Sequence, residues 1–254
     1  MRILLTNDDG IHAHGLKILE QIAAEIGGEA TVVAPETDQS GVAHSLSLND
    51  PLRLRKIAER HFAVRGTPTD CVIMGARKIM ADNPPNLLLS GVNRGQNVAE
   101  DVTYSGTIAA AMEGALIGIP AIALSQAYGG PEGHTNMQWE CARAHAPGVI
   151  KRILKEGMGE GTLVNVNFPP CPPDEVAGVS VTTQGRRDNE LLRIEERTDG
   201  RGNPYYWLMA KRGKFTPGAG TDIEALAAKR ISITPLRLNL TDPDMMARLS
   251  TVFA

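Results

Sequence analysis

Short apolar runs alternate with longer segments of helical periodicity through the first two thirds of the chain. Five runs predict buried strands: residues 3–5, 30–34, 86–90, 121–124 and 162–166. Apolar residues at helical spacing predict helices between them, over residues 16–26, 69–80, 105–117 and 137–154. Strands separated by helices indicate βαβ units, so we expect an α/β fold, a Rossmann-like doubly wound and mostly parallel sheet.

Antiparallel pairs are predicted at two places. Residues 52–55 and 61–64 alternate like a small hairpin beside the sheet. Near the C-terminus, β-like residues 191–197 and 205–210 flank a dense turn sequence, which predicts a protruding β-hairpin extension over approximately 185–215. Its aromatic residues, 205–207, suit either an interface between copies of the chain or packing on the chain's own body.

No internal repeat or independent linker divides the chain, so residues 1–254 are expected to form a single domain. The last predicted strand spans residues 230–234 and should end at Pro235. The formal net charge of −3 provides no basic field for a nucleic-acid polymer. No apolar run is long enough to cross a bilayer. The odd number of cysteines, three that are not closely spaced, and the absence of a signal-peptide pattern favour a cytoplasmic protein without a disulfide framework.

Two adjacent carboxylates, Asp8 and Asp9, follow the first predicted strand. Ligands of open α/β sheets bind at the carboxyl ends of the strands, and neighbouring carboxylates repel each other unless a cation lies between them. The pair therefore indicates a divalent-metal site, although an ordinary helix cap and turn explains two aspartates equally well.

Two further loops are expected at the same edge of the sheet. Ser40 follows the second strand, and the segment from Ser90 to Asn97, with Asn93 inside it, follows the third. Two carboxylates, a hydroxyl and an amide oxygen form a hard donor set, which suits Mg²⁺, Mn²⁺ or Ca²⁺ better than Zn²⁺.

A candidate anion site comes next along the chain. Ser105, Gly106 and Thr107 open the alanine-rich helix that follows the asparagine loop. Unpaired N–H groups at a helix start attract anions, and a glycine allows a phosphate to approach. The alternative is that Ser105 simply caps the helix. His12 and His44 are weaker acid–base candidates, and Asp70 is expected to cap the helix that it opens.

Six motifs occur together in one order along the chain. They are Leu5–Gly10, Ala34–Pro35 with Ser40–Gly41, Gly66–Cys71, Ser90–Asn93 with Asn97, Tyr104–Thr107 and Ser232–Pro235. In this order the chain resembles the SurE family, the survival protein SurE, a metal-dependent 5′/3′-nucleotidase. The resemblance covers nearly the whole sequence. One departure is the segment 227–230, where the family pattern has a glycine–aromatic step.

The resemblance implies one divalent metal cation per subunit, most simply Mg²⁺ or Mn²⁺, with Asp8, Asp9, Ser40 and Asn93 as ligands. It implies that Asn97, Ser105, Gly106 and Thr107 bind the substrate phosphate. It also implies a homodimer or homotetramer formed through the C-terminal half of the chain.

The expected activity is hydrolysis of nucleoside 5′- and 3′-monophosphates and, in some members of the family, of short polyphosphate. Metal-activated water is the expected nucleophile, with Asp8 and Asp9 as the catalytic residues. The alternative is a nucleotide-binding regulator without turnover. A dinucleotide oxidoreductase is disfavoured because the first βα turn lacks a glycine-rich fingerprint.

Overall fold

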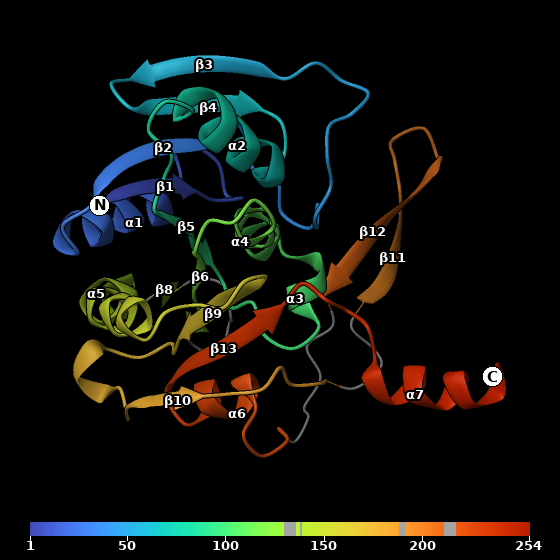
Figure 1. Cartoon of the computed structure of the whole chain (residues 1–254). Coiled ribbons are helices and arrows are strands. Elements are labelled where there is room, and N and C mark those ends of the chain that lie inside the picture. The colour runs from blue at the N-terminus through green and yellow to red at the C-terminus, as the bar shows by residue number, and fades with distance from the viewer. Residues whose placement is uncertain (130–135, 138, 188–191, 211–216) are drawn as a thin grey trace.

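The computed structural model describes residues 1–129, 136–137, 139–187, 192–210 and 217–254 (Figure 1). Within these residues a nine-stranded sheet runs through the centre of the molecule. In sheet order its strands are β10 (Val179–Val181), β13 (Ile231–Arg237), β9 (Thr162–Phe168), β6 (Ala121–Gln126), β5 (Leu87–Arg94), β1 (Arg2–Thr6), β2 (Glu29–Pro35), β4 (His61–Arg65) and β3 (Arg53–Ala58).

The six strands from β9 to β4 are parallel, and β3 and β13 run antiparallel to their inner neighbours. The chain builds the sheet outward from β1 in both directions: β2 lies on one side and β5 on the other. The boundary between β1 and β5 is therefore the topological switch point, where ligands of such sheets bind.

Helices cover both faces of the sheet. On one face α1 (His14–Glu25) and α5 (Trp139–Glu156) pack against side chains that include Ile3 and Leu5. On the other face α2 (Pro68–Met74) and α4 (Gly106–Leu116) pack against Leu4. The doubly wound α/β class predicted from the apolar runs is confirmed.

Shorter elements complete the described chain. They are the π-helical turn Gly75–Ile79, α3 (Asp101–Tyr104), β7 (Tyr128–Gly129), β8 (Asn136–Met137), the 3₁₀ turn Pro173–Glu175, β11 (Leu192–Thr198), β12 (Pro204–Ala210), α6 (Asp222–Ala227) and α7 (Pro243–Val252). No helix among the described residues is both long and apolar enough to pass through a membrane.

The expectation that Pro235 ends the last strand is wrong, because β13 continues through it to Arg237. The neighbouring strand β10 pairs with β13 only as far as Ile233. Beyond that point β13 has β9 as its neighbour on one side alone, and Pro235 lies opposite Val164. A proline is tolerated in a strand segment with an open side because its missing N–H breaks no bond there.

The predicted C-terminal hairpin is present as the antiparallel pair β11 and β12 (Figure 1). Figure 1 shows it standing off from the sheet and its helices. Trp207 is 52% exposed, and Tyr205 and Tyr206 are exposed as well, so the described residues leave much of these aromatic side chains uncovered, which favours the interface alternative. Gly185 and Arg187, which fall inside the expected range of the arm, bond instead to α6 and α3. Residues 188–191 and 211–216 of that range lie outside the described residues.

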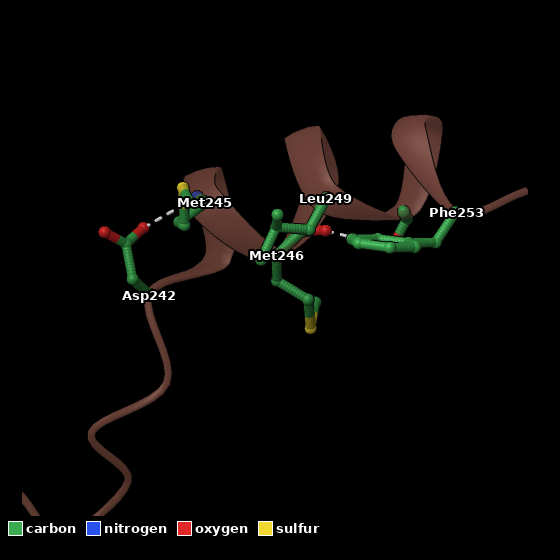
Figure 2. Close-up of a pocket in the computed structure, with 6 residues that line it drawn as sticks. Asp242, Met245, Met246, Leu249 and Phe253 are labelled. Atoms are coloured by element: carbon green, nitrogen blue, oxygen red, sulfur yellow. Dashed lines mark hydrogen bonds between the residues drawn. The ribbon is translucent and has the colours of Figure 1, made fainter.

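Helix α7 has no buried residue. Asp242 caps it by accepting hydrogen bonds from the N–H groups of Asp244 and Met245. Figure 2 shows a hollow along this helix that is lined by Met246, Leu249 and Phe253 among others.

Candidate functional site

Polar side chains replace apolar ones at the carboxyl ends of four neighbouring strands, on the face covered by α2 and α4. Residues two apart share a face of a strand, and Leu4, Leu88, Ala123 and Leu163 mark this face lower in the sheet. The polar residues that continue it are Thr6 in β1, Ser90 in β5, Ser125 in β6, and Asn165 and Asn167 in β9. The opposite face stays apolar, with Leu5, Leu124 and Val166 in its core. The sheet therefore presents one polar edge beneath the start of α4.

Asp8 lies at this edge and is buried, with 4% of its surface exposed. Its Oδ1 accepts a hydrogen bond of 2.5 Å from Oγ1 of Thr107, in the first turn of α4. A Cβ atom placed on Gly106 would lie 2.8 Å from the Asp8 Cβ, so the helix start can approach this closely only with a glycine. Gly106 and Thr107 thus contact Asp8 directly, in addition to the phosphate role predicted for them.

Burial raises the pKa of Asp8 from 3.8 to about 7, and the Thr107 hydrogen bond opposes this shift. The nearby charges of Asp9 and Asp38 raise the pKa of Asp8 further. Burial also raises the pKa of Asp9, whose Oδ2 accepts a hydrogen bond of 3.2 Å from the N–H of Arg94. The charge of Asp38 raises the pKa of both carboxyl groups. Asp38 was not among the site residues predicted from the sequence. Its position two residues before Ser40 in the same loop was the available signal.

The loop that carries Ser40 is tied to this edge by main-chain bonds. The N–H of Gln39 donates to the carbonyl of Asp8 at 2.8 Å, and the N–H of Ser40 donates to Asp38 Oδ1 at 2.7 Å. On the neighbouring strand, Asn93 Nδ2 donates to the carbonyl of Gly95 at 2.8 Å. Because the nitrogen end of the Asn93 amide is used in this way, its oxygen is the end available to a cation.

Ser105 is the N-cap of α4, since its hydroxyl oxygen accepts a hydrogen bond of 3.1 Å from the N–H of Ile108. Ser105 therefore caps the helix. The cap uses the oxygen of the hydroxyl, which leaves its proton to be donated to a ligand. Asn97 is buried, and its amide donates to Ser125 Oγ at 2.9 Å. The sequence did not predict Ser125, Asn165 and Asn167 as site residues, because their strands were predicted from apolar residues alone.

The donor set fits a hard divalent cation. Asp8 and Asp9 bring two carboxylates to a partly dehydrated place, where the charge of Asp9 raises the pKa of Asp8 and the charge of Asp38 raises the pKa of both. Such pairs are stabilised by a cation. Thr6 and Ser90, next to each other in β1 and β5, have buried hydroxyl oxygens that form no hydrogen bond with any described residue. Among the described residues no group of three or more His, Cys, Asp or Glu side chains is placed to hold a metal. The expected set contains only two such residues, with Ser40 and Asn93 supplying the other oxygens.

Two of the three remaining candidates, Asp70 and His44, have structural partners. Asp70 and Thr67 form a capping box at the start of α2, as predicted for Asp70. Nε2 of His44 lies 3.2 Å from Oε2 of Glu113 in α4, and His12 is exposed.

Comparisons with known proteins point to one family. A family model described as survival protein SurE matches residues 3–191. A curated relative from Methylocella silvestris, named 5′-nucleotidase SurE, is 64% identical over 248 residues and covers 98% of each chain. A relative of the same name from Methylobacterium nodulans is 61% identical over 253 residues and covers 100% of both chains. The crystal structure of SurE protein from Aquifex aeolicus is similar with a TM-score of 0.85 at 38% identity, over 100% of both chains.

Proposed function

Since this chain belongs to the SurE family, we propose that it is a metal-dependent phosphomonoesterase that hydrolyses nucleoside 5′-monophosphates to nucleoside and phosphate. The names of the full-length relatives support a 5′-nucleotidase. The observation that carries the proposal is the pair Asp8 and Asp9 at the switch point of the sheet, against the first turn of α4. Activity on 3′-monophosphates and on short polyphosphate stays a prediction.

We assign one divalent cation per subunit, Mg²⁺ or Mn²⁺, to the oxygens of Asp8, Asp9, Ser40 and Asn93. A cation bound there supplies a Lewis acid that neutralises phosphoryl charge and activates water for attack. Support comes from the hard oxygen chemistry of the set and from the orientation of the Asn93 amide.

The chain's own residues then orient the reactants. Thr107 holds Oδ1 of Asp8 in place, which fixes the direction of its other oxygen. The first N–H groups of α4, at Gly106 and Thr107, favour the negative charge that develops on the phosphoryl oxygens. We assign the Asn97 amide and the Ser105 hydroxyl as further donors to the phosphate. Asp8 or Asp9 removes the proton from the attacking water, so both are assigned as catalytic.

A covalent mechanism, with one aspartate attacking phosphorus, is disfavoured because an oxygen held by the cation would have to leave it to reach phosphorus, whereas a coordinated carboxylate can accept a proton from a neighbouring water without moving. Turnover in the presence of a trapping reagent distinguishes the two mechanisms. Accumulation of a phosphoaspartate would contradict attack by water.

The test of the function is phosphate release from AMP and GMP with Mn²⁺ or Mg²⁺, followed by chelation with EDTA. We expect release that stops on chelation and resumes when the metal is restored. Tight nucleotide binding without phosphate release would support the alternative, a nucleotide-binding regulator.

We also propose that the protein is a homo-oligomer, a homodimer or a homotetramer. Exposed apolar side chains on the hairpin and on α7, including Ile194, Trp207, Leu208 and Phe253, support it. Native mass measurement in solution tests this assignment. The cytoplasmic location stays a prediction; Cys71, Cys141 and Cys171 are all free thiols, as a reducing compartment requires.

A further inference from the structure

Asn97 is held by its main chain as well as by its side chain. Its N–H donates to Asn167 Oδ1 at 2.8 Å, and its carbonyl accepts from Asn167 Nδ2 at 3.1 Å. The amide of Asn167 thus pairs with both main-chain groups of Asn97, as a neighbouring strand would. Asn165 Nδ2 donates to the same carbonyl at 2.8 Å, and Asn167 Nδ2 also donates to Asn165 Oδ1 at 3.2 Å.

The side chain of Asn97 is fixed by a separate contact. One hydrogen of its amide nitrogen is donated to Ser125 Oγ at 2.9 Å. An amide nitrogen carries two hydrogens, so a second remains available once the first is used in this way. The Ser125 contact therefore sets the plane in which the second N–H points.

These three partners are fully buried polar residues: Ser125, Asn165 and Asn167 are all 0% exposed, as are Thr6 and Ser90 in the neighbouring strands. The three partners lie in register, with Ala123 opposite Asn165 and Ser125 opposite Asn167. Ser125 is also in register with Asn93 on its other side. Asn93, Ser125 and Asn167 therefore lie side by side across β5, β6 and β9, and the last two bond to Asn97. Burying three such groups is costly unless each is satisfied, and here the contacts converge on one loop residue.

We propose that Ser125, Asn165 and Asn167 are positioning residues of the phosphate subsite, with Ser125 orienting the Asn97 amide towards a phosphoryl oxygen. The inference rests on the proposed function, because it takes Asn97 as a phosphate contact. Asn165 and Asn167 fix the position of the loop that carries Asn97, and Ser125 fixes the orientation of the Asn97 amide.

A double-mutant cycle between Ser125 and Asn97 tests the assignment. The variants are Ser125→Ala, Asn97→Ala and the double variant, in the full chain with Mn²⁺. The readouts are KM and kcat for AMP, the Kd of inorganic phosphate by calorimetry, and the Kd of Mn²⁺. Since Ser125 acts through one hydrogen bond to Asn97, Ser125→Ala should weaken phosphate binding and raise KM about tenfold. The affinity for Mn²⁺ should not change. In the Asn97→Ala background the same change should have no further effect.

Two additional variants separate positioning from packing. Ser125→Cys leaves no cavity but replaces the hydroxyl with a slightly larger thiol that is a weak acceptor. It should therefore lose as much phosphate affinity as Ser125→Ala even if the alanine variant folds poorly. Thr182→Val, the control, removes a buried hydroxyl that bonds to Ser232 and Thr234, and it should leave phosphate affinity unchanged.

Equal losses from Ser125→Ala with and without Asn97, or no loss in either background, would overturn the inference. Phosphate binding by the wild-type protein without turnover would instead refute the proposed hydrolysis, and the binding cycle would still decide the role of Ser125. A wild-type protein that binds no phosphate would overturn both.

Discussion

In the metal-free protein, the Asp8 carboxylate is expected to oppose folding at neutral pH. Burial raises the pKa of Asp8 from 3.8 to about 7, so the folded state holds the proton more tightly than the unfolded chain does. The stability that this group contributes is present in full below about pH 4 and is lost as the pH rises towards 7. The loss reaches about 4 kcal/mol above pH 7, because each pKa unit corresponds to about 1.4 kcal/mol.

The change Asp8→Asn removes this cost, while Thr107 can still donate to the amide oxygen. We expect the metal-free variant to be about 2–4 kcal/mol more stable than wild type at about pH 8, since the new amide group offsets part of the gain. For a chain of 254 residues this raises Tm by roughly 4–15 °C. Near pH 4 the two proteins should unfold at similar temperatures. Thermal unfolding in EDTA across this pH range measures the difference.

Asp70→Asn is the matched control, because Asp70 is a buried carboxylate that accepts two main-chain N–H bonds. It should lower Tm where Asp8→Asn raises it. Added Mn²⁺ should stabilise wild type and leave Asp8→Asn unchanged. An Asp8→Asn variant that is less stable than wild type at both pH values would show that the buried charge of Asp8 does not limit the stability of the metal-free protein. A variant that gains as much stability from Mn²⁺ as wild type would show that Asp8 is not a metal ligand.

Three further changes probe the contact between α4 and the carboxylates. Gly106→Ala places a methyl group 2.8 Å from the Asp8 Cβ, so it should destabilise the protein by about 1–3 kcal/mol in thermal unfolding and weaken Mn²⁺ binding. Thr107→Val removes the donor to Asp8 and should reduce Mn²⁺ affinity about 10- to 100-fold by calorimetry, with unchanged affinity arguing against an orienting role. Ser105→Ala should cost about 1 kcal/mol of stability as a lost cap; it should also raise KM or lower kcat, and an unchanged kcat/KM would leave Ser105 as a cap alone.

Local sequence predicts a strand or a helix correctly where a single hydrophobic period dominates the segment. The apolar run before Asp8 predicts β1, and the spacing of apolar residues predicts α1, without reference to distant parts of the chain. Both elements are present. The predicted helix over 69–80 instead divides into α2 and a π-helical turn. Helix α7 was missed, although Asp242 followed by Pro243 is a usual helix start.

The contacts within the site depend on partners that are distant in sequence, and no local pattern reveals them. Thr107 was predicted from its place at a helix start, but its bond to Asp8 spans 99 residues. Asn167 meets Asn97 across 70 residues. The spacing of Leu163, Asn165 and Asn167 on one face of β9 was the available indication that polar groups there serve a purpose.

The proposed metal site brings Asp8, Asp9, Ser40 and Asn93 to one divalent cation beside the start of α4. Anomalous diffraction at the manganese edge from crystals grown with Mn²⁺ tests it most directly. We predict one anomalous peak per chain, within coordination distance of oxygens from all four residues. A peak bound elsewhere, or these side chains turned to different faces of the molecule, would contradict the account.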